Sequence, residues 1–218
     1  HLGPSFPTRR SSDLLFFMWA VGINQTSAII FATPVTAGGY GFSILSTGYL
    51  YFTPIVAVCI GEIFGHFFND FVASQYTRTH HGNFKAEARL VPSYIAAAFM
   101  IPGIILIGQA LTKHLHYAAI IMGWGMYVFG CMIASVAVTA YALDAYPTGS
   151  GEVSGFINVA RLCGGFAVGY FQQPWGNKVG YDVSFGTQAG LIGVGLSIII
   201  CLHIFGLRMR RWGGKLEI

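Results

Sequence analysis

Charged side chains are scarce in this chain. Asp, Glu, Lys and Arg make up 9% of its 218 residues, hydrophobic residues make up 54%, and the mean hydropathy is +0.61. A soluble globular domain usually carries about 25% charged residues. The chain therefore has too little polar surface to cover a water-facing body, and the lipid bilayer is the first partner that the sequence predicts.

Signatures of several other protein classes are missing as well. The net charge of +4 is small and dispersed, so nucleic acid is not expected as a partner. We find no nucleophile–base set and no P-loop, and we predict neither an enzyme nor a bound cofactor. The cysteines lie in apolar segments without metal-ligand spacing, which predicts no disulfide framework and no metal site. They are Cys59, Cys131, Cys163 and Cys201.

Long hydrophobic stretches dominate what is present. A membrane-crossing helix needs about 20 mainly apolar residues. Six stretches meet this length, at residues 15–33, 48–71, 91–112, 117–141, 153–173 and 184–207. Because the connections between them are short, consecutive helices are expected to be antiparallel neighbours. The sequence predicts an all-α membrane protein, a six-transmembrane-helix bundle over residues 15–207 with a basic tail at 208–218.

The first fourteen residues do not share this pattern. They combine Pro, Arg and Ser without periodicity, and residues 5–14 resemble the translation of a common sequencing-adapter oligonucleotide. We interpret residues 1–14 as an artefact or a disordered linker and leave them out of the predicted fold.

The distribution of Lys and Arg predicts the orientation in the membrane, because short cytoplasmic loops are enriched in them. The loop at 74–89 and the tail lie on one side, and the opposite side has only Lys113 and Lys178. With six crossings, both termini are expected in the cytoplasm, and the plasma membrane is the expected location. The basic residues on the cytoplasmic side are Arg78, Lys85, Arg89, Arg208, Arg210, Arg211 and Lys215.

Ionisable side chains inside a membrane span are costly, so each is a functional candidate. Glu62, His66 and Asp70 follow one another at four-residue intervals and share one helical face. We interpret Glu62, the deepest of them, as a proton- or cation-binding carboxylate. The alternative is an interhelical hydrogen bond or ion pair that only holds the bundle together. His66 and Asp70, with Arg78 in the following loop, are predicted to belong to a cytoplasmic gate.

The fifth stretch carries Asn158 and Arg161 about two helical turns from its cytoplasmic end. Arg161 requires an anionic partner at that depth, and the candidates are Asp144, Glu152 and Glu62. We expect an ion pair that forms part of the gate, with a static structural pair as the alternative.

Amide side chains interrupt the first stretch at Asn24 and Gln25. Amides at bilayer depth usually form hydrogen bonds across helices or line a polar cavity. Together with Asn158 and Glu62, they are predicted to line a pathway for substrate or protons.

Three runs resemble a known family: GEIFGHFFND at 61–70, FKAEARL at 84–90, and YALDAYPTGSGE at 141–152 with GFINVAR at 155–161. They resemble the C-terminal half of fungal major facilitator superfamily (MFS) transporters. The closest likeness is to the proton-coupled, multidrug-like branch that includes polyamine and organic-cation carriers. The resemblance covers about residues 15–212.

The resemblance implies a carrier of twelve helices in two six-helix halves, which binds substrate between the halves near the midplane and works by alternating access. The chain would then be a fragment that lacks its N-terminal six-helix half. The loop after the second helix corresponds to the repeat of the family's cytoplasmic gating motif, in which Gly65 and Asp70 are recognisable but no Arg follows Asp70.

These observations lead to a first hypothesis, a fragment of a proton-coupled secondary transporter for small organic solutes or cations. Two alternatives stay open. One is a polytopic membrane protein that does not transport, such as a receptor-like or scaffolding bundle. The other is a self-assembling channel.

Overall fold

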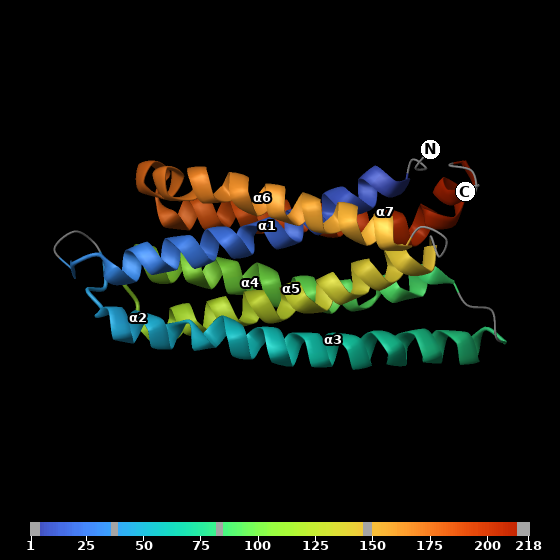
Figure 1. Ribbon diagram of the computed structural model, residues 1–218, viewed down its shortest axis with the longest axis horizontal. Helices are drawn as coiled ribbons and strands as arrows, with labels where there is room; N and C mark the ends of the chain where they lie inside the picture. The colour runs from blue at the N-terminus through green and yellow to red at the C-terminus, as the bar shows by residue number, and fades with distance from the viewer. Residues whose placement is uncertain (1–4, 36–38, 82–84, 146–149, 213–218) are drawn as a thin grey trace.

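Six long α-helices run back and forth along one axis in the computed structural model, which describes residues 5–35, 39–81, 85–145 and 150–212 (Figure 1). Side chains are described over the same ranges except at 5–14, 25, 145, 150 and 206–212. No strand occurs in these ranges, so the predicted all-α fold is confirmed. The long helices are α1 (Ser5–Ala32), α3 (Phe52–Thr79), α4 (Pro92–Thr112), α5 (Tyr117–Ala145), α6 (Ser150–Val179) and α7 (Tyr181–Trp212). Two short helices, α2 (Ile44–Leu50) and the 3₁₀ helix η2 (Ala86–Leu90), precede α3 and α4.

Local sequence explains where several helices begin and end. Pro92 is the first residue of α4, where its missing N–H needs no partner and its fixed φ suits the helix. The Ser43 hydroxyl accepts a hydrogen bond from the backbone N–H of Ser46 at 3.2 Å and caps α2. Gly180 alone separates α6 from α7, and its φ of 96° is one that other residues rarely adopt. The connection between α6 and α7 is therefore tight, and consecutive long helices are antiparallel (Figure 1).

Helix α5 lies at the centre of the bundle and packs against α1, α3 and α4. Its side chains Trp124, Tyr127 and Tyr141 are among the largest that are fully buried. The Tyr127 hydroxyl donates a hydrogen bond of 2.6 Å to the backbone carbonyl of Phe16, which ties α5 to α1. On the other side of the bundle, α1 packs against α6 and α7.

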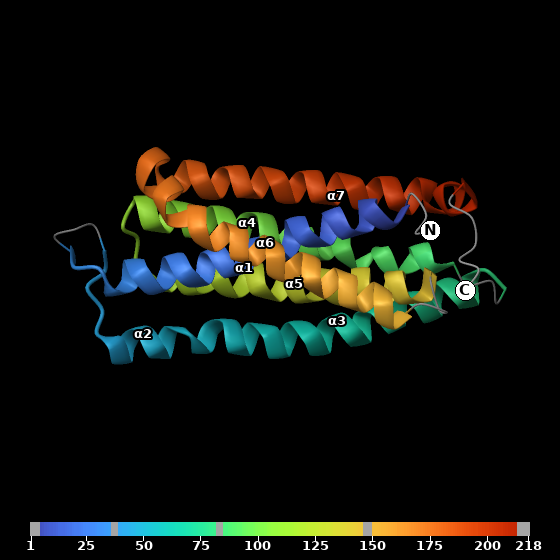
Figure 2. The ribbon, with the colours of Figure 1, turned by 45° about the horizontal axis from the view of Figure 1, so that its top comes forward.

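Helix α3 lies at the edge of the bundle, on the side opposite α7 (Figure 2). Its buried residues are Ala57, Gly61, Gly65, Asn69 and Ala73, one every fourth position, and they form a single seam against α5. A Cβ atom on Gly61 would lie 2.9 Å from Met132 Cβ, and one on Gly65 would lie 3.2 Å from Ile133 Cα. The glycines therefore let the two backbones approach closely, as small residues do between helices in lipid.

Five segments of the described chain are long and apolar enough to cross a membrane: Leu15–Ala32, Ile44–Thr79, Ala86–Thr112, Tyr117–Asp144 and Tyr181–Phe205. The sequence predicted six, and residues 153–173 are the stretch that does not qualify. They lie within α6, where polar residues such as Asn158, Arg161 and Gln172 lower the hydropathy. Helix α6 still packs along α1, and its other face is exposed.

The first turn of α1 and the last turn of α7 lie at the same end of the bundle (Figure 1). The end of α3 and the start of α6 also lie there. Helix α1 begins at Ser5, within the segment 1–14 that we interpret as an artefact or a disordered linker. The adapter origin of this segment stays a prediction.

Candidate functional site

A polar cavity of about 400 Å³ lies between α3, α5 and α6. Polar side chains from all three helices line it, and apolar residues of α5 and α6 complete the wall. Three residues that the sequence predicted to act in transport, from helices far apart in the sequence, are brought together here. The polar lining consists of Glu62, Ser135, Thr139, Ser154, Asn158 and Arg161.

Arg161 is held in this cavity by neighbours on two other helices. Its Nη2 donates to the Thr139 hydroxyl of α5 at 3.4 Å, and its guanidinium lies 5.0 Å from the centre of the Phe17 ring of α1. A cation over an aromatic face is attracted by the ring quadrupole. Arg161 is half-buried, whereas Glu62 and Asn158 are exposed along the outer faces of α3 and α6. The cavity thus offers a carboxyl group, a guanidinium cation and several hydrogen-bonding groups on one side of the bundle.

The amides of α1 occupy other surroundings. The backbone carbonyl of Asn24 accepts a hydrogen bond of 2.7 Å from the Tyr51 hydroxyl. Asn24 Oδ1 is buried without a hydrogen-bond partner in the described part of the chain, and Asn24 is not among the residues that line the polar cavity. The side chain of Gln25 lies outside the described residues.

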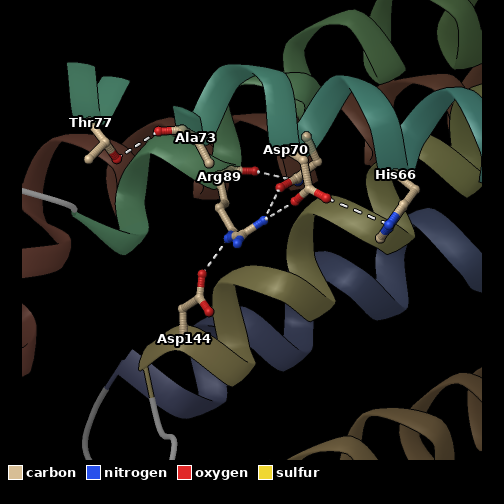
Figure 3. A network of polar contacts seen from close by, with 7 residues as sticks. His66, Asp70, Ala73, Thr77, Arg89 and Asp144 are labelled. Carbon is tan, nitrogen blue, oxygen red and sulfur yellow. Dashed lines mark hydrogen bonds and ion pairs between the residues drawn. The ribbon is translucent and has the colours of Figure 1, made fainter. Parts of the chain in front are cut away.

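A second polar cluster lies at the end of the bundle where α3 ends, and it is centred on Arg89 of η2 (Figure 3). Arg89 Nη1 donates to Asp70 Oδ1 at 3.1 Å and to Asn69 Oδ1 at 2.7 Å. Arg89 Nε donates to the carboxylate of Asp144 on α5. One guanidinium therefore bridges two carboxylates on different helices, an arrangement that suits its planar fork of donors.

Asn69 and His66 extend this Arg89 cluster along α3. Asn69 is 1% exposed, and its Nδ2 donates to the backbone carbonyl of Arg89 at 3.3 Å. His66 Nε2 lies 3.6 Å from Asp70 Oδ2, the carboxylate oxygen that does not face Arg89 (Figure 3). The cluster borders a cavity of about 610 Å³ whose lining includes Arg78.

The structure brings most of the predicted gate residues together around Arg89 and leaves Glu152 apart from them. Asp70, His66 and Asp144 share the Arg89 cluster, and Arg78 lines the same cavity. Asp144, which the sequence offered as a partner for Arg161, forms an ion pair with Arg89. Glu152 is exposed on the first turn of α6.

Sequence reasoning missed the central residue of this cluster. It used Arg89 to predict orientation and as part of the run at 84–90 that carries the family resemblance, but it did not pair Arg89 with Asp70 or Asp144. Nothing local shows that η2 folds back between α3 and α5. It also missed a buried pair between α6 and α7, in which Gln188 Nε2 donates to Gln172 Oε1 at 2.7 Å. The available signal was that both of the last two apolar stretches contain glutamine, with Gln172 and Gln173 in one and Gln188 in the other.

Comparison with known proteins gives weak but consistent similarities. No family model and no solved structure matches the chain. An uncharacterized MFS-type transporter of Schizosaccharomyces pombe is 26% identical over 161 residues, which is 74% of this chain and 28% of that protein. Dityrosine transporter 1 of Saccharomyces cerevisiae is 26% identical over 60% of this chain and 25% of its own length. A probable efflux pump of Aspergillus flavus is 26% identical over 82% of this chain and 41% of its own length.

These relatives are all fungal, and their names are those of transporters and efflux pumps rather than of enzymes. The chain spans between a quarter and about two fifths of their length. The resemblance to fungal MFS transporters is confirmed at this level, while the multidrug or polyamine branch stays a prediction. The chain is thus an all-α membrane protein whose helical bundle corresponds to half of the MFS fold.

Proposed function

We propose that the chain is half of a secondary transporter that moves a small organic solute across a membrane by alternating access, coupled to protons. The observation that carries this proposal is the polar cavity between α3, α5 and α6, which brings Glu62, Asn158 and Arg161 together on one side of the bundle. Ionisable groups at bilayer depth are costly and usually face a bundle interior or a water-filled pathway.

The proposed partner is a second six-helix half that covers this cavity. Glu62 and Asn158 are exposed on α3 and α6, so lipid would face them directly if nothing else did. A second half packed over this side would enclose them, and substrate would bind between the halves. The relatives are two to four times longer than the matched segment, which leaves room for such a half. We propose a plasma-membrane location with both termini in the cytoplasm.

The charges in the cavity favour a polar organic solute. Glu62 suits a cationic group of the solute, while Arg161 and Thr139 suit an acceptor or anionic group. One relative is named for the transport of dityrosine, an amino-acid derivative that carries both amino and carboxyl groups. We therefore propose organic cations and amphoteric amines as the substrate class.

Glu62 is the proposed coupling residue. It lies on the cavity wall, where a carboxyl group can take up a proton on one side of the membrane and release it on the other as access alternates. Within the described residues Glu62 forms no ion pair, which leaves its carboxylate available for a proton or a cation.

The Arg89 cluster is the proposed cytoplasmic gate. It joins η2, α3 and α5 at the end of the bundle that the Lys and Arg distribution assigns to the cytoplasm. Ion pairs at this end can hold one state of the transporter closed and separate in the other.

The test is uptake of labelled candidate solutes by vesicles that contain the complete protein, with and without a proton gradient. A carrier gives saturable uptake and counterflow, and Glu62→Gln should abolish the acceleration by the gradient while leaving insertion unchanged. Asp182→Asn is the matched control, because Asp182 lies in the first turn of α7 and does not line the polar cavity. Uptake that does not saturate would indicate a channel, and solute binding without flux would indicate a receptor. Normal gradient-driven uptake by Glu62→Gln would remove Glu62 from the mechanism.

A further inference from the structure

A second hollow of the bundle, an apolar groove of about 560 Å³, lies between α3, α4 and α5. Its wall is made almost wholly of hydrocarbon and aromatic side chains, including Val56, Ile60, Phe99, Met122 and Met126. All three helices lie in segments that can cross a membrane: Ile44–Thr79, Ala86–Thr112 and Tyr117–Asp144. Whatever fills the groove must therefore be apolar and available inside the bilayer.

The groove and the polar cavity lie on opposite sides of the seam between α3 and α5. Gly61 faces α5, and each residue of a helix is rotated by about 100° from the one before it. Ile60 and Glu62 must then project to the two opposite flanks of the seam, and they line the groove and the cavity respectively. A second half that covers the Glu62 side leaves the Ile60 side in contact with lipid.

The length of the groove matches one leaflet. On α3 its lining runs from Phe52 to Ile60, and on α5 it runs from Ile121 to Phe129. Each run covers about 12 Å at a rise of about 1.5 Å per residue, whereas the hydrocarbon of one leaflet is about 15 Å thick.

Aromatic rings lie at the end of the groove that is nearest the middle of the helices. The rings of Phe99 and Phe129 meet edge to face with centroids 5.2 Å apart, and the Phe64 ring lies 5.7 Å from that of Phe129. The other end of the groove lies on the side of the turn at residues 113–116, where α4 passes into α5. The groove thus runs along the outer face of the bundle, from the side of the α4–α5 turn toward the middle of the helices.

We propose that this groove binds one acyl chain of a phospholipid from the leaflet on the side of the α4–α5 turn. An acyl chain is long, thin and apolar, so it matches the groove in length and in chemistry. Met122 and Met126 are flexible and polarizable, so they can adjust to chains of different length and unsaturation.

Gly125 lines the groove and leaves space there because it has no side chain. A Cβ atom there would approach only Thr53 Cγ2, at 3.6 Å, which is an ordinary contact. A larger side chain at position 125 should therefore fill the groove without moving either backbone. Gly190 on α7 offers a matched control, because a Cβ atom there would meet nothing within 4 Å.

The test uses the full-length protein in vesicles that contain phosphatidylcholine with a photoreactive group on one acyl chain, followed by mass spectrometry of the labelled peptides. Labelling should be at least five-fold higher at groove residues than at Val194 and Ile204, which are exposed on α7. Groups near the glycerol should label Met122, and groups near the chain end should label Phe129. Gly125→Leu should lower groove labelling at least five-fold, and Gly190→Leu should leave it unchanged.

Several outcomes would overturn the proposal. Equal labelling of the groove and of α7 would mean that the groove holds only ordinary surrounding lipid. Preferential labelling by a photoreactive sterol, with exclusion of the phospholipid, would assign the groove to a different ligand. If Gly125→Leu does not fold, Val56→Trp tests the same filling from α3, and undiminished labelling in that variant would count against the proposal.

Discussion

Arg89 Nη1 lies 3.1 Å from Asp70 Oδ1, and the same guanidinium donates to Asp144. The contact joins η2 to α3 and α5 near the last of the small residues that form the α3–α5 seam. Side chains fasten the two helices at this end, whereas close backbone packing holds them along the membrane-spanning part. The two kinds of contact predict different responses to mutation.

Replacing Arg89 by Gln should destabilise the bundle. The change leaves Asp70 and Asp144 near each other without their shared cation, and their side chains are 55% and 32% exposed, so solvent screens part of the loss. We expect a loss of about 1–3 kcal/mol in unfolding free energy. Thermal unfolding in detergent at low and at high salt measures it, and the difference should shrink at high salt. An equal loss in Arg78→Gln, which removes a cation from the same cavity, would contradict a specific role for Arg89.

The seam predicts that Gly61→Ala is destabilising although alanine favours helices. Its Cβ would lie 2.9 Å from Met132 Cβ and 3.1 Å from the Phe129 carbonyl oxygen, so α3 must move away from α5. Overpacking of this kind costs about 1–3 kcal/mol. Thermal unfolding and disulfide trapping between engineered cysteines on the two helices report the stability and the separation. Gly186→Ala, where the added atom has open space, is the control and should unfold at the temperature of the unmodified protein or above it.

The buried glutamine pair predicts a rescue. In Gln188→Leu, Gln172 Oε1 loses its donor at 2.7 Å while Gln172 stays 1% exposed. We expect a loss of about 1 kcal/mol, as for other side-chain hydrogen bonds between membrane helices. Gln172→Leu combined with Gln188→Leu removes both polar groups and should recover most of the stability. A double variant less stable than either single variant would show that these side chains have further roles in the fold.

Tyr40 predicts a response to alkaline pH. Its hydroxyl donates to the carbonyls of Ala110 and Leu115 at 3.1 and 3.0 Å, and burial raises its pKa above the ordinary value of 10.0. Because the folded pKa is raised, this contribution to stability is fully present below pH 10 and is lost as the pH rises through the folded pKa. Tyr40→Phe should lower stability at neutral pH and flatten the decline above pH 10. Parallel declines in the two proteins would contradict this assignment.

The sequence predicts a structural feature well when neighbouring residues in the chain determine it, as they do for some helix boundaries. The boundaries of α4 and α5 lie close to the predicted stretches 91–112 and 117–141, because Pro92 and the polar turn at 113–116 mark them in the sequence. The length of α6 was underestimated, since the helix continues through Pro174 to Val179 after the apolar residues end. Hydropathy reports contact with lipid, and a helix such as α6 that contributes side chains to a polar cavity is more polar.

The candidate site residues also divide into those that the sequence indicates and those that depend on tertiary packing. The cost of charge in lipid singles out Glu62 and Arg161 as candidates, and the structure places both on one cavity. The pairing of Arg89 with Asp70 and Asp144 depends on how the chain returns from α3 through η2. Contacts across such a turn are set by tertiary packing, and no spacing rule encodes them.

The seam of α3 also constrains how the protein is made. Helix α3 packs mainly on α5, which follows it in the chain, and α1 packs mainly on α6 and α7, which come last. Both early helices therefore leave the ribosome before their partners exist. During biosynthesis the seam of α3 must therefore stay uncovered, with Gly61 and Gly65 unpacked, until α5 is inserted beside it.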